Sequence, residues 1–282
     1  MREATDVRRV VLVVFDGLRP DAIETFAMRH LATLARRSAH TFTAQTVAPS
    51  VTAACMASLF SGVPPSLHGL RSDRFHIPRA RCHLEFLPSV LAEAALPSSA
   101  FVRQVPLLMR STASRIARHL GFSTAQFVPG GAAPILACAL PALLTQRHGL
   151  IVMHWPDCDQ AGHDHGWMSD AYGRAAQYLD GALGALLGAI DLEHDHSTVL
   201  IVLADHGGGG TASHDHDSAH AMDRTIPIVI AGGAIGSGVL REAVRLLDVP
   251  PTILWALGAR IPSSYSGRPL VEAFSRSREA AA

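Results

Sequence analysis

Five short segments carry residue types that bind metal ions or act as nucleophiles. In chain order they are FDG with Asp16, SVT with Thr52, DCDQAGH with Asp159 and His163, ADHG with Asp205 and His206, and SHDHDSAH with His214, His216 and His220. Each segment alone is also compatible with a polar turn. Together they supply carboxylates, imidazoles and one hydroxyl, a donor mixture that suits zinc or manganese.

Histidine is concentrated in the second half of the chain. The sequence has 16 histidines, and ten of them fall between His148 and His220. Histidine is the commonest metal ligand in proteins. The clustering therefore favours a metal site built largely from this part of the chain.

Thr52 lies directly before an apolar stretch that is typical of a helix. As the N-cap of a helix at 53–60, its side chain would bond to unpaired backbone N–H groups, which is a structural role. The same position puts its hydroxyl at the positive end of the helix, where an alkoxide or a bound phosphate is stabilised. Both interpretations remain open from these residues alone.

The pattern of apolar runs predicts an α/β fold. Buried strands are expected at 9–15, 149–154, 198–204 and 226–231, and helices at 53–60, 87–95, 169–190 and 240–247. Alternating strands and helices imply a largely parallel sheet, whose ligands bind at the carboxyl ends of the strands. Asp16, His154 and Asp205 stand at or directly after such ends.

Composition favours one large domain with no strong charge. The chain has 282 residues, 48% of them hydrophobic, and 24 basic side chains balance 24 acidic ones. This balance argues against a nucleic-acid polymer or an anionic membrane as partner. The apolar run near the start is too short for a signal peptide or a membrane span, so a cytoplasmic location is expected. Residues 1–282 are interpreted as one domain, with a small lid or insertion within the proline-rich region 73–147.

The order of the motifs resembles the alkaline phosphatase superfamily, in its type I phosphodiesterase and nucleotide pyrophosphatase branch. FDG, SVT followed by SG and HG, DxxxH, DHG and a late histidine before a TIP strand occur in the same order, and the tail DVPPTILWALGARIPSSYSGRPL is also similar. The resemblance covers nearly the whole chain except its middle. It implies a three-layer alkaline-phosphatase-like fold with a largely parallel central sheet.

The resemblance also implies two divalent metal ions, zinc or alternatively manganese. One ion would be held by Asp16, Thr52, Asp205 and His206, and the other by Asp159, His163 and a late histidine. His216 is chosen for this last position because it precedes Thr225 by the spacing expected in the family, while His214 and His220 remain open. Asp157 is expected to lie behind the ligands.

The activity implied is cleavage of phosphodiester or pyrophosphate bonds through a phosphothreonine at Thr52. The partner would be a small phosphate ester, and the oligomeric state stays open. A phosphomonoesterase or phosphonate hydrolase on the same site is one alternative, and a metal-binding homologue without turnover is another.

One departure from the family pattern concerns substrate binding. Nucleotide pyrophosphatase relatives have an asparagine after HG that donates to a phosphate oxygen, and this chain has Asp73 there. An ionised carboxylate would repel phosphate. Either Asp73 turns away and Arg71 or Arg74 binds the anion, or the substrate differs from the usual diester.

Overall fold

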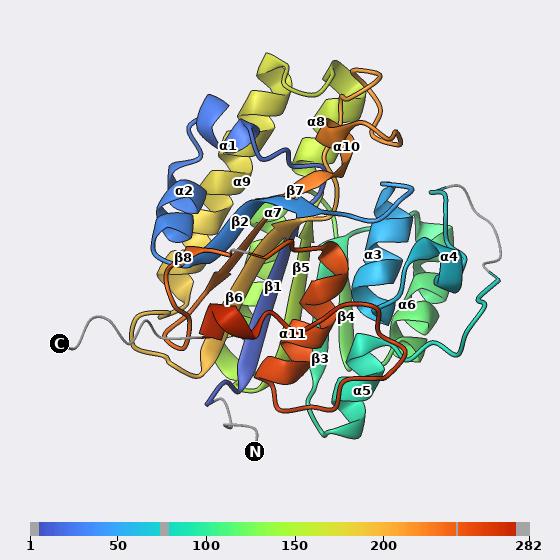
Figure 1. Cartoon of the computed structure of the whole chain (residues 1–282), viewed down its shortest axis with the longest axis vertical. Helices are drawn as coiled ribbons and strands as arrows, with labels where there is room; N and C mark the ends of the chain where they lie inside the picture. The colour runs from blue at the N-terminus through green and yellow to red at the C-terminus, as the bar shows by residue number, and fades with distance from the viewer. Residues whose placement is uncertain (1–5, 74–78, 241, 275–282) are drawn as a thin grey trace.

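Three apolar runs rich in Val, Ile and Leu pair side by side at the centre of one sheet. β1 (Arg9–Phe15) lies between β5 (Gly149–Trp155) and β6 (Thr198–Ala204) and is parallel to both. These strands are almost wholly buried, as expected where helices cover both faces of a parallel sheet. The computed structural model describes residues 6–73, 79–240 and 242–274, and Figure 1 shows the sheet crossing the middle of the molecule.

Five further strands extend the sheet on both sides of this centre. They are β2 (Ala39–Gln45), β3 (Ser98–Arg103), β4 (Thr124–Val128), β7 (Thr225–Ala231) and β8 (Gly238–Val239). The strand order is β4-β3-β5-β1-β6-β7-β2-β8. β7 is antiparallel to β6 and to β2, and the remaining neighbours pair in parallel. The largely parallel α/β fold expected from the sequence is confirmed.

The helices form two layers, one on each side of the sheet. α2, α7 and α9 pack together and against strands on one side, and α3, α5 and α11 pack together on the other. The α-helices are α1 (Ala22–Thr25), α2 (Arg29–Arg36), α3 (Thr52–Ser61), α4 (Pro65–His68), α5 (Leu87–Glu93), α6 (Arg110–His119), α7 (Ala132–Thr145), α8 (Asp157–His165), α9 (Asp170–Ala189), α10 (Ala221–Arg224) and α11 (Val249–Ala256). Short 3-10 turns are η1 (Leu107–Met109), η2 (Leu246–Asp248) and η3 (Val271–Phe274).

Most of the predicted elements are present, and one is wrong. The four predicted strands correspond to β1, β5, β6 and β7, and three of the predicted helices to α3, α5 and α9. The helix predicted at 240–247 is replaced, among its described residues, by irregular chain that enters η2 only at Leu246. The reason is pairing with β2, because Gln45 donates to the carbonyl of Val244 at 2.9 Å and forms a parallel bridge with Arg245.

The region 73–147, for which a lid is predicted, also contributes to the body of the fold. Its strands β3 and β4 extend the sheet, and α7 covers it. By contrast, η1 and α6 contain no buried residue. The lid itself stays a prediction.

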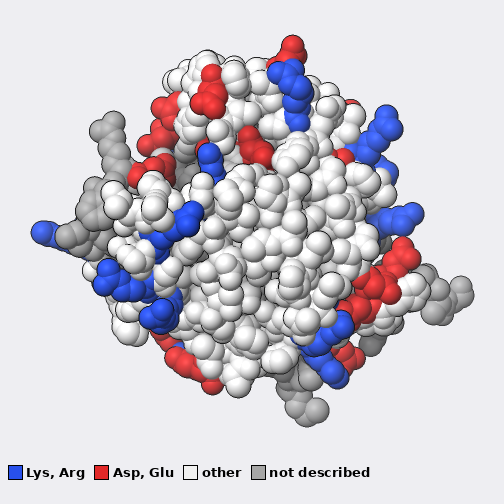
Figure 2. Space-filling view, turned by 180° about the vertical axis from the view of Figure 1, so that it is seen from behind, with Lys and Arg blue, Asp and Glu red and all other residues white. Residues whose placement is uncertain are grey.

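The rear face of the molecule carries few charges near its centre. Figure 2 shows Lys, Arg, Asp and Glu side chains mainly around the rim, with a broad central area free of them. α7, which has no charged residue, lies behind the sheet in the view of Figure 1. Of the helices in the three described ranges, none combines the length and apolarity needed to span a bilayer.

Candidate active site

The candidate ligands follow three neighbouring strands at one edge of the sheet. Asp16 comes directly after β1, and Asp205 and His206 come directly after β6. Next to β1 on the other side, β5 is followed by α8, which carries Asp159 and His163. The pairing registers of β1 with both neighbours run to the last residue of each strand. The ends are therefore level, and side chains that follow them meet.

The first predicted ligand group converges around the ring of His206. Its Nε2 lies 3.2 Å from Asp16 Oδ1 and 3.7 Å from Asp205 Oδ2. The hydroxyl of Thr52 lies 3.1 Å from the same nitrogen and 3.4 Å from Asp16 Oδ1. Asp16, Asp205 and His206 are buried. The structure thus brings all four residues of this group together.

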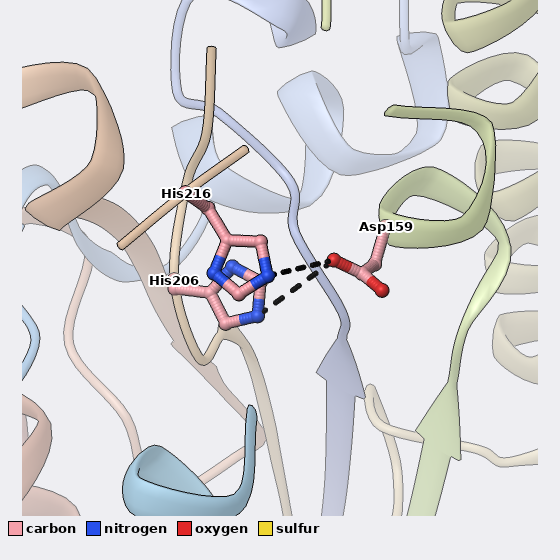
Figure 3. A group of neighbouring side chains, drawn as sticks. All are labelled: Asp159, His206 and His216. Atoms are coloured by element: carbon pink, nitrogen blue, oxygen red, sulfur yellow. Dashed lines mark ion pairs between the residues drawn. The ribbon is translucent and has the colours of Figure 1, made fainter. Parts of the chain in front are cut away.

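The second predicted group is adjacent to the first. Asp159 Oδ1 lies 3.4 Å from His163 Nε2 and 3.6 Å from His216 Nε2, and these two nitrogens are 3.1 Å apart. The same oxygen is 3.9 Å from His206 Nε2. Figure 3 shows Asp159 facing His206 and His216, whose rings are stacked with centroids 4.0 Å apart.

Backbone carbonyls orient the three histidine rings of these groups. The Nδ1 atoms of His163, His206 and His216 lie 2.9, 2.9 and 2.7 Å from the carbonyl oxygens of His214, Gly207 and Ser50, respectively. A ring that donates its Nδ1 proton to a carbonyl leaves the lone pair of Nε2 free for a metal ion. Each Nε2 points into the ligand groups, so the rings already have the orientation that metal binding requires.

Two carboxylate oxygens of these groups are buried without a hydrogen bond from any described residue. Asp205 Oδ2 and Asp159 Oδ1 are buried and have no hydrogen-bond partner among the described residues. Burial, together with the charges of Asp205 and Asp159, raises the pKa of Asp16 well above its ordinary value. Burial disfavours a charged His206, but the surrounding carboxylates outweigh it and raise the pKa of the ring. Unpaired buried oxygens beside imidazole nitrogens fit two divalent cations, and the donor types suit zinc or manganese.

Thr52 is the first residue of α3, and its side chain does not cap the helix. The N-cap is Val51, in extended conformation, so Thr52 does not have the N-cap position that one of its two interpretations gave it. The hydroxyl instead faces Asp16 and His206. Because the first N–H groups of a helix are unpaired and carry partial positive charge, this is a favourable place for an oxyanion.

Of the three late histidines, the structure brings His216 to the ligands. His216 is buried, whereas His214 and His220 are exposed. His214 Nδ1 lies 3.0 Å from the carbonyl oxygen of His163, and His220 accepts from the N–H of Met222 at the start of α10. The spacing argument that selected His216 therefore agrees with its position.

The residues predicted to bind the substrate lie in different places. Asp73 Oδ1 accepts a 2.8 Å hydrogen bond from the backbone N–H of Ala53, next to Thr52. Arg71 donates to the carbonyl of Pro65 at 3.5 Å, and in the described part of the chain it has no hydrogen bond or ion pair with either ligand group. Arg74 lies outside the described residues.

Asp157 does not support the metal ligands as the sequence suggested. Its Oδ2 accepts a 3.0 Å hydrogen bond from the N–H of Ala132 at the start of α7. Burial raises its pKa. The side chain therefore caps the N-terminus of a neighbouring helix.

His154 is a member of the site that the motifs missed. It is the second-last residue of β5, and its Nε2 lies 3.5 Å from Asp16 Oδ2, buried and without a hydrogen-bond partner among the described residues. With Asp16 and Asp205 it forms a further cluster of metal-ligand type. The sequence of the strand could have pointed to this residue, because His154 is the only polar side chain in GLIVMHW apart from the indole of Trp155.

Comparison with known families divides the chain between two models. Residues 10–139 match type I phosphodiesterase/nucleotide pyrophosphatase, and residues 131–261 match the metalloenzyme superfamily. The 2,3-bisphosphoglycerate-independent phosphoglycerate mutase of Listeria monocytogenes is 30% identical over 126 residues, which is 45% of this chain and 24% of the mutase. The match thus spans about a quarter of the length of such curated relatives.

Solved structures share the fold over most of the chain. The phosphonate monoester hydrolase of Silicibacter pomeroyi has a TM-score of 0.69 at 16% identity, covering 96% of this chain and 78% of the hydrolase. Murine ectonucleotide pyrophosphatase/phosphodiesterase 5, in an inactive form bound to AMP, has a TM-score of 0.72 at 14% identity, covering 92% of this chain and 97% of that protein. Sulfatases are also among the similar folds.

Proposed function

Since the chain belongs to the alkaline phosphatase superfamily, we propose that it is a two-metal hydrolase of phosphodiester or pyrophosphate bonds. One observation carries the proposal. The hydroxyl of Thr52 stands within 3.4 Å of Asp16 and His206, at the start of a helix and beside two sets of metal-ligand donors.

The residues have distinct parts in this reaction. Bound cations would supply the positive charge that stabilises the alkoxide of Thr52 and the charge that develops on the phosphoryl oxygens. Asp16, Asp205 and His206 would hold one of them, and Asp159, His163 and His216 the other. The imidazole bonds to backbone carbonyls keep the Nε2 atoms directed at the site throughout.

The reaction would proceed in two displacements at phosphorus. Thr52 gives its hydroxyl proton to water, and its Oγ1 forms a bond to phosphorus while the bond to the leaving oxygen breaks. The leaving group takes the electron pair and a proton from water. Water then attacks the phosphothreonine, which releases the second product and restores the hydroxyl. Because the N-terminus of α3 and the cations stabilise the oxyanion, no separate general base is required.

A phosphonate monoester hydrolase is the second candidate, and the position of Asp73 favours it over a phosphomonoesterase. The carboxylate of Asp73 remains at the start of α3 next to Thr52, so it adds negative charge near the bound phosphoryl group. A phosphonate monoester carries one negative charge at neutral pH, as a diester does. A non-catalytic metal-binding homologue is the third candidate.

Metal analysis and four p-nitrophenyl substrates test these candidates. We expect two zinc or manganese ions per chain, chelator-sensitive cleavage of bis-p-nitrophenyl phosphate or p-nitrophenyl phenylphosphonate, and slower cleavage of p-nitrophenyl phosphate and sulfate. Active, chelator-sensitive protein with at most one metal would contradict the two-metal site. Full metal content without any turnover would favour the non-catalytic homologue.

A further inference from the structure

An acidic side chain from a distant loop closes the N-terminus of α3. Asp73 lies 20 positions beyond Ala53 and accepts the N–H of that residue at 2.8 Å. The helix has no cap from the side chain of its own N-cap residue, Val51. Asp73 is exposed to solvent.

This carboxylate is close to the place where chemistry occurs. The nitrogen of Ala53 is bonded to the carbonyl carbon of Thr52, so covalent geometry puts Asp73 Oδ1 within about 7 Å of the Thr52 hydroxyl. A phosphoryl group on Thr52 would need an N–H donor at the same helix end. Asp73 already occupies the donor of Ala53.

Asp73 changes the net charge of the proposed two-metal site by one unit. Three of the ligand side chains are carboxylates, those of Asp16, Asp159 and Asp205. With two divalent cations they leave one net positive charge, and Asp73 cancels it. The nearby arginines Arg71, Arg79 and Arg81 line a separate cavity of about 370 Å³, and in the described ranges none of them is paired with Asp73.

We propose that Asp73 is a specificity-determining residue that restricts the site to singly charged esters. Resting on the function proposed above, it selects phosphodiesters and phosphonate monoesters over phosphate monoesters, because a dianion meets one more unit of repulsion than a monoanion. At a few ångströms and an effective dielectric of about 20, this extra unit of repulsion lowers the relative rate for the dianion about a hundredfold. A purely structural cap would stabilise α3 without discriminating between substrates.

Asp73→Asn tests this selection in the metal-loaded protein. The amide oxygen can still accept from Ala53, so the variant keeps the cap and loses the charge. We expect the ratio of kcat/KM for p-nitrophenyl phosphate to that for bis-p-nitrophenyl phosphate to rise about a hundredfold. Asp73→Ser provides a second uncharged side chain. Asp170→Asn is the matched control, because Asp170 is an exposed acid in the first turn of α9, and the ratio should stay unchanged.

Phosphate binding separates the role of Asp73 from the catalytic proposal. Titration calorimetry with inorganic phosphate at pH 8 should show tighter binding to Asp73→Asn by at least about a hundredfold, because phosphate is mainly a dianion at this pH, whether or not the protein turns over any ester. Loss of hydrolysis with this gain in binding would contradict the proposed function alone. An unchanged substrate ratio together with unchanged phosphate affinity would overturn the role of Asp73.

Discussion

An ionisable side chain is buried at each end of β1, but the surroundings of the two side chains differ. At the start of the strand, Arg9 donates to Thr198 Oγ1 at 3.0 Å and to the carbonyls of Leu143 and Gln146 at 2.6 and 3.1 Å. Its guanidinium also lies 3.5 Å from Asp195. Directly after the end, Asp16 lies among buried polar atoms of Asp159, Asp205 and His154 that have no hydrogen-bond partner among the described residues.

The comparison shows that burial of a charge does not by itself identify a functional site. Arg9 and Asp16 are 3% and 4% exposed, so exposure does not separate them. Their hydrogen-bond partners do separate them, because a buried polar atom without a partner destabilises the fold by about 1–3 kcal/mol. Such atoms persist where a ligand satisfies them. Changes at the start of β1 should therefore affect stability, and changes beyond its end should affect activity.

Thr52→Ala should have the largest effect. The variant lacks the attacking oxygen but keeps six ligand side chains, so we expect kcat to fall by at least about a thousandfold with metal content nearly unchanged. Thr52→Ser should retain part of the activity. Kinetics with a diester and elemental analysis provide the measurement. Wild-type turnover in the alanine variant would show that another group is attacked.

Arg9→Met should have the largest effect on stability. It removes the donor to two buried carbonyls and leaves Asp195 without its cation, so we expect a loss of about 3–5 kcal/mol in the free energy of unfolding. Arg8→Met is the matched control, because Arg8 is the exposed neighbour, and it should change stability by less than about 0.5 kcal/mol. Urea unfolding measures both. Equal losses in the two variants would remove the distinction between the ends of β1.

His68 is another buried side chain with hydrogen-bond partners, here on both ring nitrogens, so its ionisation should affect stability. Its Nε2 bonds Ser58 Oγ at 2.9 Å, and its Nδ1 accepts from Leu70 N–H at 3.1 Å. Burial lowers the pKa of this ring from 6.5 to about 4. The unfolded chain therefore binds a proton that the folded chain does not, and stability should fall by about 3 kcal/mol as pH drops from 6.5 to 4. Urea unfolding over this range should show a smaller fall in His68→Gln, and identical slopes would contradict the assignment.

Asp205→Asn should stabilise the metal-free protein by about 2 kcal/mol while weakening metal binding. Asp205 Oδ1 accepts from the N–H groups of Gly17 and His206, which an amide oxygen can replace, and Oδ2 has no hydrogen-bond partner among the described residues. Unfolding of chelator-treated protein measures this gain. Asp195→Asn should instead lose stability, because Asp195 pairs with Arg9 and Thr198. A loss in Asp205→Asn would mean that its carboxylate is already satisfied without a cation.

The centre of the fold could be predicted because its strands are continuous apolar runs. β2, β3 and β4 were missed for the opposite reason. Their sequences AHTFTAQ, SSAFVR and TAQFV contain polar residues, and only part of each is buried. Such segments become strands through pairing with a neighbour already in the sheet, which no local pattern reveals.

The candidate site could be predicted where ligands follow strands at regular spacing. Asp159 and His163 are one helical turn apart on α8, and Asp205 and His206 directly follow β6. The contacts of Asp73 and Asp157 could not be predicted in this way. Each accepts a helix N–H that lies 20 or 25 positions earlier in the chain, and such a contact depends on how the loops pack.

The central place of β1 also has a consequence during synthesis. Its two partner strands begin only at Gly149 and Thr198, so the nascent chain exposes RVVLVVF on both edges for on the order of ten seconds before the first partner is made. A short apolar segment of high β propensity is prone to pair with other chains. Arg9 is the one charged residue of this strand, and a flanking charge opposes such pairing. The residue that holds the start of β1 in the folded protein thus also protects the unpaired strand from aggregation.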